Sequence, residues 1–272
     1  MPFSHASVVE TLRLTDRMQR IVLHVDDPAT LDIEPAGDSA VGVYFPSDGS
    51  AGSVSVGRHY SLRHHDGPII TVDVTVHTGG PGTRWALTAE PGDRVGLDHA
   101  RSWYRPAADT AWQLLVADLA GLPAAARIVD ELAEDAEAVL VVEVADPGDL
   151  GYLPEHPLVT VIPLVGSGNG CAPSALARTV EALRLPEGRG YCWFAGEAAE
   201  SRAARRHLRG LGWTIDQYDV SGYWRFDSEA WDQRFAELQD DVVAVYQRAL
   251  ADGKSDKVAL EEFDEACARV GL

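Results

Sequence analysis

The sequence predicts two domains, an N-terminal antiparallel β-barrel followed by an α/β domain with an open parallel sheet, and then a helical C-terminal extension. Its 272 residues are enough to build two hydrophobic cores. Residues 7–105 are short, alternating apolar segments separated by Gly, Pro and Asp, which is typical of antiparallel strands. From about Ala111, apolar strands alternate with helical stretches, which predicts parallel crossover units. The expected bounds are 1–108, 109–226 and 227–272.

Each predicted element follows from its own pattern. The barrel strands are expected at "IVLHV", "AVGVYF", "HYSLRH", "IITVDVTVH" and "RVGLDH". The second domain is expected to place strands at "WQLLVAD", "AVLVVEVA", "LVTVIPLV", "YCWFAGE" and "TIDQYDV". Its helices are expected at "LPAAARIVDELA", "APSALARTVEALRL" and "ESRAARRHLRGL".

The extension reads as two helices joined by "DGKSD". Its first helix carries apolar side chains at steps of three or four residues: Trp231, Phe235, Leu238, Val242 and Tyr246. Such a stripe must cover either the body of the chain or a second subunit, so a monomer and a homodimer are both compatible with it.

Composition excludes several classes of partner. The net charge of -19 opposes binding to nucleic acid or to an anionic membrane surface. The sequence contains no run of about eighteen apolar residues, so no membrane-spanning helix is predicted. The N-terminus lacks the basic segment followed by an apolar segment that a signal peptide has, so we expect a cytoplasmic protein. Cys171, Cys192 and Cys267 lie far apart, without a CxxC pair or a Cys/His cluster, so no metal site is predicted. Redox chemistry would therefore need a bound organic cofactor.

The octapeptide "RHYSLRHH" at residues 58–65 carries the first chemical signal. On a strand, Arg58 and Tyr60 share one face, where a guanidinium can pair with a pyrophosphate and a phenol ring can lie on a flat heterocycle. Ser61 points to the other side and could reach the edge of that heterocycle. An ordinary exposed strand with scattered polar residues explains the octapeptide alone equally well.

A glycine-rich loop, "HTGGPGTRWALTA", follows one strand later. Its glycines let the backbone approach a ligand closely, and the helix that starts near Thr83 leaves unpaired N–H groups for a phosphate. Arg84 adds positive charge. Together with the octapeptide, this loop could hold both ends of one dinucleotide.

At this point the chain resembles the siderophore-interacting proteins, flavin-dependent ferric-siderophore reductases of the ferredoxin-reductase-like superfamily. The likeness runs from about residue 5 to 226 and rests on "GRHYSLRHHD", "VHTGGPGTRWALTAEPGDRVGL", "LPAAARIVDEL", "VEVAD", "CWFAGEAAESRAARRHLR" and "SGYWR", in that order. The resemblance implies that FAD is bound in the barrel domain. The implied FAD contacts are Arg58, His59, Tyr60, Ser61, Asp73, His77, Gly80, Gly82, Thr83, Arg84, Trp85 and Ala86.

The resemblance also implies a site for NADPH or NADH in the second domain. Its residues would be Asp118, Gly196, Glu197, Arg202 and Arg205, at the edge of the sheet where open α/β folds bind ligands. The arginines could also be a solvated basic helix face. Relatives commonly have "Gly-Asp-Glu-Thr" before the "LPA" turn, whereas this chain reads "ADLAGLPA"; a ferredoxin-like donor is therefore an alternative.

The implied substrate is an anionic ferric siderophore, attracted by basic side chains near the flavin. The candidates are Arg225 first, then Arg63, His64 and Arg101. No catalytic acid or base is expected, because electrons pass through FAD to iron. A general flavin or ferredoxin reductase is the alternative enzyme, and a non-catalytic flavin- or siderophore-binding protein is the alternative outside catalysis.

Overall fold

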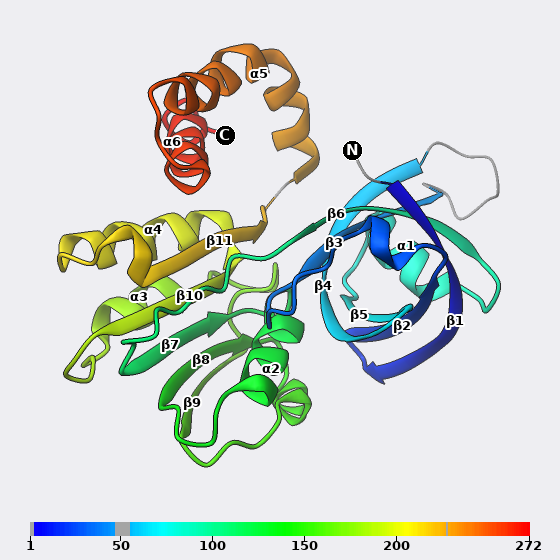
Figure 1. Ribbon diagram of the computed structural model, residues 1–272, viewed down its shortest axis with the longest axis horizontal. Helices are drawn as coiled ribbons and strands as arrows, with labels where there is room; N and C mark the ends of the chain where they lie inside the picture. The colour runs from blue at the N-terminus through cyan, green and yellow to red at the C-terminus, as the bar shows by residue number, and fades with distance from the viewer. Residues whose placement is uncertain (1–2, 47–54, 227) are drawn as a thin grey trace.

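A computed structural model describes residues 3–46, 55–226 and 228–272, and Figure 1 shows its three parts. The expected start of the extension, residue 227, lies outside the described residues. The predicted fold class is confirmed: a closed antiparallel barrel, a parallel five-stranded sheet with helices on both faces, and a C-terminal pair of helices. The residue bounds predicted for the domains stay predictions.

The barrel forms from six strands in the order β1-β2-β5-β4-β3-β6. These strands are β1 (Phe3–Thr15), β2 (Met18–Val25), β3 (Ala40–Pro46), β4 (Ser55–Asp66), β5 (Ile69–Thr75) and β6 (Arg94–Arg101). A short helix, α1 (Pro81–Thr88), joins β5 to β6. Alternation places one side-chain row of each strand in a common apolar core, which includes Phe45, Leu62 and Leu97.

The second domain orders its parallel strands β11-β10-β7-β8-β9. Its strands are β7 (Trp112–Ala117), β8 (Ala138–Val144), β9 (Val159–Val165), β10 (Gly190–Glu197) and β11 (Tyr218–Trp224). The chain winds outward from β7 in one direction and then returns to β10 on its other side. Between β7 and β10 the winding therefore reverses, and open α/β sheets bind ligands at the carboxyl ends of such strands.

Helices cover both faces of this sheet because its central strands are apolar on both. Leu115 and Ala117 pack against α2 (Leu122–Glu131), whereas Leu114 and Val116 face α3 (Leu176–Ala182) and α4 (Ala198–Gly210). Short 3-10 turns, η1 (Pro28–Thr30), η2 (Pro147–Tyr152) and η3 (Ile215–Gln217), complete the connections. No described helix is long and apolar enough to cross a membrane.

The two domains are joined through a buried carboxylate, Asp38. It accepts hydrogen bonds from the backbone N–H groups of Trp103 (3.0 Å) and Tyr104 (2.9 Å) in the connecting segment, and from the indole N–H of Trp193 (3.1 Å) on β10. A charge that is removed from water needs several donors of this kind. The position of the α/β domain relative to the barrel is therefore fixed by groups from both.

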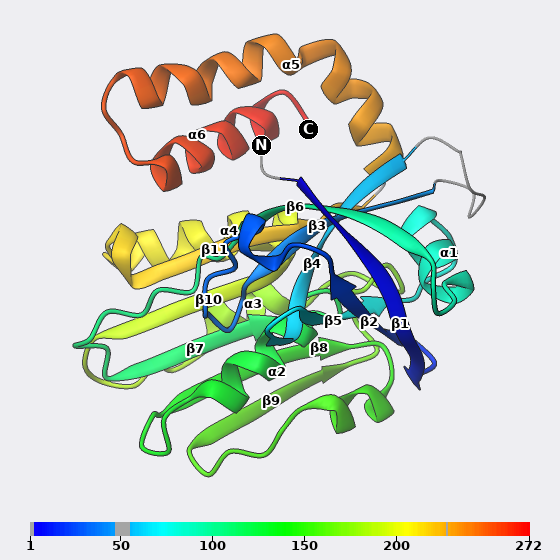
Figure 2. The same ribbon diagram turned by 45° about the vertical axis from the view of Figure 1, so that its right-hand side comes forward.

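The C-terminal hairpin consists of α5 (Ser228–Ala251) and α6 (Asp256–Arg269), and it lies over α4 and β11 (Figure 2). The predicted apolar stripe of α5 is used within the hairpin: Trp231, Phe235 and Leu238 pack with residues of α6 and the C-terminus. This apolar cluster is separate from the cores of the two domains.

Candidate functional site

The cradle at one end of the barrel brings together β4 and the start of α1. Gly82 in the first turn of α1 lies so close to Tyr60 that a Cβ atom there would stand 2.5 Å from the phenol oxygen. Gly80, just before the helix, has φ +91°, which glycine adopts without strain. Among the described residues, no side chain caps the first turn of α1, so its N–H groups remain available to an anion.

Tyr60 is half-buried, and its ring lies 5.9 Å from the ring of Trp85, tilted by 37°. Burial raises the pKa of Tyr60, so the phenol stays protonated. Arg58, on the same face of β4, is exposed and donates to the carbonyl of Gly57. His59, the residue between them, is exposed and follows the opposite face.

Two of the residues predicted to contact FAD, Trp85 and Ala86, are part of the hydrophobic core of the barrel. Trp85 is 4% exposed and stacks on Phe45 with ring centroids 4.7 Å apart, and Ala86 is fully buried beside the same core. The Thr83 hydroxyl accepts a hydrogen bond from the backbone N–H of His77 (3.3 Å) and so fixes the loop before α1. Burial lowers the pKa of His77, which keeps its imidazole neutral. Arg84 follows Thr83 in the first turn of α1 and is exposed.

Ser61 faces the second domain. It is buried, and its hydroxyl donates a hydrogen bond to the Tyr223 hydroxyl on β11 (3.3 Å). In the strand register, Ala40 of β3 lies opposite Ser61 of β4 on one side and opposite Arg101 of β6 on the other. Arg101 and Ser61 therefore belong to the same row across the sheet, with β3 between them. Its guanidinium lies 5.0 Å from the Trp103 ring centroid, and its buried Nε has no hydrogen-bond partner among the described residues.

These residues fit a flavin dinucleotide. The uncapped start of α1 and Arg58 can take a pyrophosphate, and the close approach that only glycine permits at position 82 places an aromatic ring beside them. Ser61 supplies a hydroxyl at the domain interface, where the flat ring of the cofactor would be held.

The carboxyl ends of β7 and β10 form the second part of the site. Asp118 follows β7 and is buried; its carboxylate accepts from the N–H groups of Ala120 (2.9 Å) and Gly121 (3.3 Å). Burial raises the pKa of Asp118 to about 6, although a hydrogen bond from the Trp224 indole opposes the shift. A Cβ atom at Gly196 would stand 3.2 Å from Asp118 Oδ2, so the two predicted residues meet where the winding reverses.

Glu197 and the two predicted arginines are engaged within the protein. The Glu197 carboxylate caps α4 by accepting from the N–H of Ala199 (2.6 Å). Arg202 and Arg205 both pair with Asp264 on α6, at 3.1 and 2.7 Å. The face of α4 that was predicted to meet a nucleotide therefore lies under the C-terminal hairpin.

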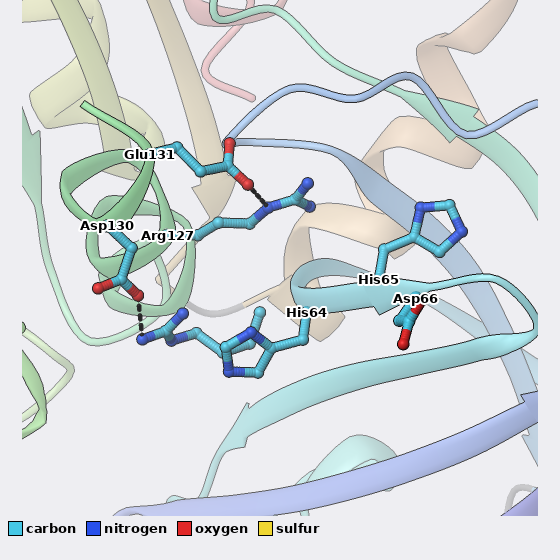
Figure 3. Close-up of a pocket in the computed structure, with 7 residues that line it drawn as sticks. His64, His65, Asp66, Arg127, Asp130 and Glu131 are labelled. Carbon is cyan, nitrogen blue, oxygen red and sulfur yellow. Dashed lines mark hydrogen bonds and ion pairs between the residues drawn. The ribbon is translucent and has the colours of Figure 1, made fainter. Parts of the chain in front are cut away.

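The predicted substrate residues do not form one cluster. Arg225 lies against the hairpin, with its guanidinium 4.5 Å from the Trp231 ring centroid and 3.6 Å from Asp264. Arg63 and His64 line a separate pocket of about 440 Å³ between β4 and α2 (Figure 3). Arg63 there pairs with Asp130 at 2.6 Å, and burial lowers the pKa of His64.

Asp73, on β5, is engaged within the protein. Its buried carboxylate forms a two-point ion pair with Arg20 of β2, at 2.8 and 2.7 Å, and accepts a hydrogen bond from the Tyr152 hydroxyl. Because Tyr152 ends η2, Asp73 fastens the barrel to the second domain. The structure therefore places Asp73 at a domain contact, and its role toward FAD stays a prediction.

Sequence reasoning missed the acidic face of α6 and the Asp38 junction. Glu261, Asp264 and Glu265 are spaced as one helix face, and Arg202, Arg205 and Arg209 are spaced as another. This matching spacing of opposite charges could have indicated that the two helices pack together. Asp38 gives no comparable signal, because its donors are a hydroxyl, backbone N–H groups and an indole far away in the chain.

Comparison with known proteins agrees with this layout. The family model described as siderophore-interacting protein matches residues 110–227, and that described as siderophore-interacting FAD-binding domain matches residues 50–101. The structure of a siderophore utilization protein from T. fusca is 33% identical, covers 84% of this chain and 95% of its own, and superposes with a TM-score of 0.70.

Two curated relatives match more distantly. A ferric vibriobactin reductase of Vibrio cholerae is 29% identical over 57% of this chain and 58% of its own. An NADPH-dependent ferric-chelate reductase of Escherichia coli is 25% identical over 60% of this chain and 62% of its own, so the match spans less than two thirds of either relative. The T. fusca protein, in contrast, is matched over nearly its whole length. Because of this match and the matches to the two family models, this chain belongs to the siderophore-interacting protein family.

Proposed function

We propose that this protein is an FAD-dependent ferric-siderophore reductase that works in the cytoplasm. The observation that carries the proposal is the cradle formed by Tyr60 and the glycine-started helix α1, with Ser61 of the same strand held against Tyr223 of the second domain. This arrangement holds a flavin at the interface that an electron donor and an acceptor must both reach. The names of the matched relatives support reduction of chelated iron as the reaction.

Bound FAD would supply the conversion between a two-electron donor and one-electron iron chemistry. The protein's own residues bind and orient it: α1 and Arg58 for the pyrophosphate, Tyr60 for the ring, and the Ser61 hydroxyl for the edge at the domain interface. Hard oxygen ligands hold Fe(III) much more tightly than Fe(II), so reduction releases the metal. No protein acid or base needs to take part in that step.

The donor that we propose is NADPH or NADH, bound at the carboxyl ends of β7 and β10, beside Asp118 and Gly196, where the winding of the sheet reverses. A ferredoxin-like protein is the second candidate, because the predicted nucleotide arginines are paired with Asp264. Arg101 is the substrate cation that we favour, since it shares the sheet row of Ser61 and its buried Nε lacks a partner among the described residues.

The visible absorption spectrum of the purified protein tests the proposal. We expect flavin bands that bleach under nitrogen on addition of NADPH or NADH and return when a ferric siderophore is added. A flavin that bleaches only with reduced ferredoxin would assign the second donor. Absence of flavin after incubation with FAD would contradict the proposed function.

A further inference from the structure

Three guanidinium groups converge on one carboxylate of the C-terminal hairpin. Arg202 Nη1 lies 3.1 Å and Arg225 Nη2 3.6 Å from Asp264 Oδ1, and Arg205 Nη2 lies 2.7 Å from Oδ2. Arg205 is 3% exposed, and its buried Nε has no hydrogen-bond partner among the described residues. Three cations with an unused donor suit a phosphate, which offers more oxygens and charge than one carboxylate.

The hairpin is held on the body of the protein mainly by charged contacts. Glu265 adds a second pair with Arg205 at 3.4 Å, Glu261 pairs with Arg209, and Lys257 pairs with Asp219 at 2.7 Å. Its apolar cluster lies between α5 and α6 and does not merge with the domain cores. Each of these pairs joins a largely buried side chain to a more exposed one, and a group of higher negative charge can compete for the same cations, so such a contact can open.

We propose that α6 is a displaceable acidic cap on the nucleotide site. Asp264 and Glu265 form ion pairs with a group of three arginines, Arg202, Arg205 and Arg225. A phosphate group of the nicotinamide nucleotide binds the same three arginines, so the nucleotide binds only when α6 moves away. This inference rests on the proposed function, because it assigns that phosphate to the electron donor. A closed cap lowers the apparent affinity for the donor in proportion to the fraction of molecules that are closed.

The test compares two substitutions on α6 that remove the same charge. Asp264→Asn removes the group that faces the arginines, whereas Glu262→Gln removes a carboxylate that pairs within the hairpin with Lys254 at 2.7 Å. We expect calorimetric titration with NADP+ to show binding at least about five-fold tighter for Asp264→Asn and unchanged for Glu262→Gln. Equal affinities for both variants and the unsubstituted protein would overturn the cap.

Hydrogen exchange of the unsubstituted protein gives a second test that needs no variant. Addition of NADP+ should speed exchange of the α6 amides and leave the barrel strands unchanged. Slower or unchanged exchange in α6 on saturation with NADP+ would overturn the inference.

The flavin content, and its reoxidation by a ferric siderophore after chemical reduction, are measured on the same samples. If both are normal while the cap tests fail, the cap is wrong and the reductase function stands. If flavin is absent, the proposed function and the inference fail together.

Discussion

The proposed flavin cradle and the proposed nucleotide edge, where β7 and β10 end beside α4, are built in different ways. The cradle comes from one short stretch, residues 58–86, and relies on backbone N–H groups, a glycine contact and one aromatic ring. The nucleotide edge collects side chains from β7, β10, α4 and β11, and those side chains are already paired within the protein. The difference suits a cofactor that stays bound on one side and a donor that must come and go on the other.

The largest expected effect is a pH dependence of stability that arises from Asp118, which lies at the nucleotide edge rather than in the cradle. Burial raises the pKa of Asp118 from its ordinary 3.8 to about 6, so the folded chain holds an extra proton between these values. The free energy of unfolding should therefore fall as the pH rises from about 4 to about 6, by roughly 3 kcal/mol in total from this group. In Asp118→Asn this contribution is lost, and urea unfolding at pH about 4.5 and about 7 measures the change.

The matched control for Asp118 is Asp109→Asn, because the Asp109 side chain is 73% exposed. It should keep the pH dependence of the unsubstituted protein. The same pH dependence in Asp118→Asn would show that the buried carboxylate is not the source.

Substitution in the cradle should act on flavin retention and spare the nucleotide edge. In Gly82→Ala the new Cβ would stand 2.5 Å from the Tyr60 hydroxyl oxygen, whereas in Gly79→Ala it meets nothing within 4 Å. We expect FAD to bind at least about ten-fold more weakly to Gly82→Ala, the equivalent of overpacking by 1–3 kcal/mol. The ratio of flavin to protein absorbance after gel filtration checks this, and an equal loss in Gly79→Ala would contradict the steric reason.

A smaller effect should distinguish the ring of Tyr60 from its hydroxyl. Tyr60→Ala removes the aromatic surface and should weaken FAD binding by about 1 kcal/mol beyond the lost area. Tyr60→Phe keeps the ring and should bind FAD within about two-fold of the unsubstituted protein. Fluorescence titration with FAD measures both, and equal weakening in the two variants would assign the interaction to the hydroxyl.

The smallest expected effect is on the nucleotide side. Arg202→Gln removes a cation from the predicted phosphate site but also one partner of Asp264, so the two consequences partly offset each other. We expect KM for NADPH to rise by about two- to five-fold, and by less for NADH, in line with one partly screened charge. Arg206→Gln on the exposed side of α4 is the control, and a matching rise there would show a general loss of charge.

Local patterns predicted most of the elements and the two neighbouring motifs of the cradle, but β1 (Phe3–Thr15) was not among the expected strands. The two-residue alternation in β4 and the glycine loop before α1 are neighbours in the chain, so their spacing indicates their placement. Trp85 shows the limit of such reasoning, because the motif that contains it does not reveal that its ring stacks on Phe45 inside the barrel. The pairing of Arg205 with Asp264 depends on how two helices dock, which periodicity alone does not specify.

The Asp38 carboxylate has a consequence for how the molecule comes apart. Loss of the α/β domain would strip this buried group of the Trp193 donor, and loss of the connecting segment would remove Trp103 and Tyr104 as well. An unpaired buried charge is costly, so neither domain gains by melting alone. Heating should therefore melt the barrel and the α/β sheet together in one cooperative calorimetric transition, with the ion-paired hairpin detaching at a lower temperature.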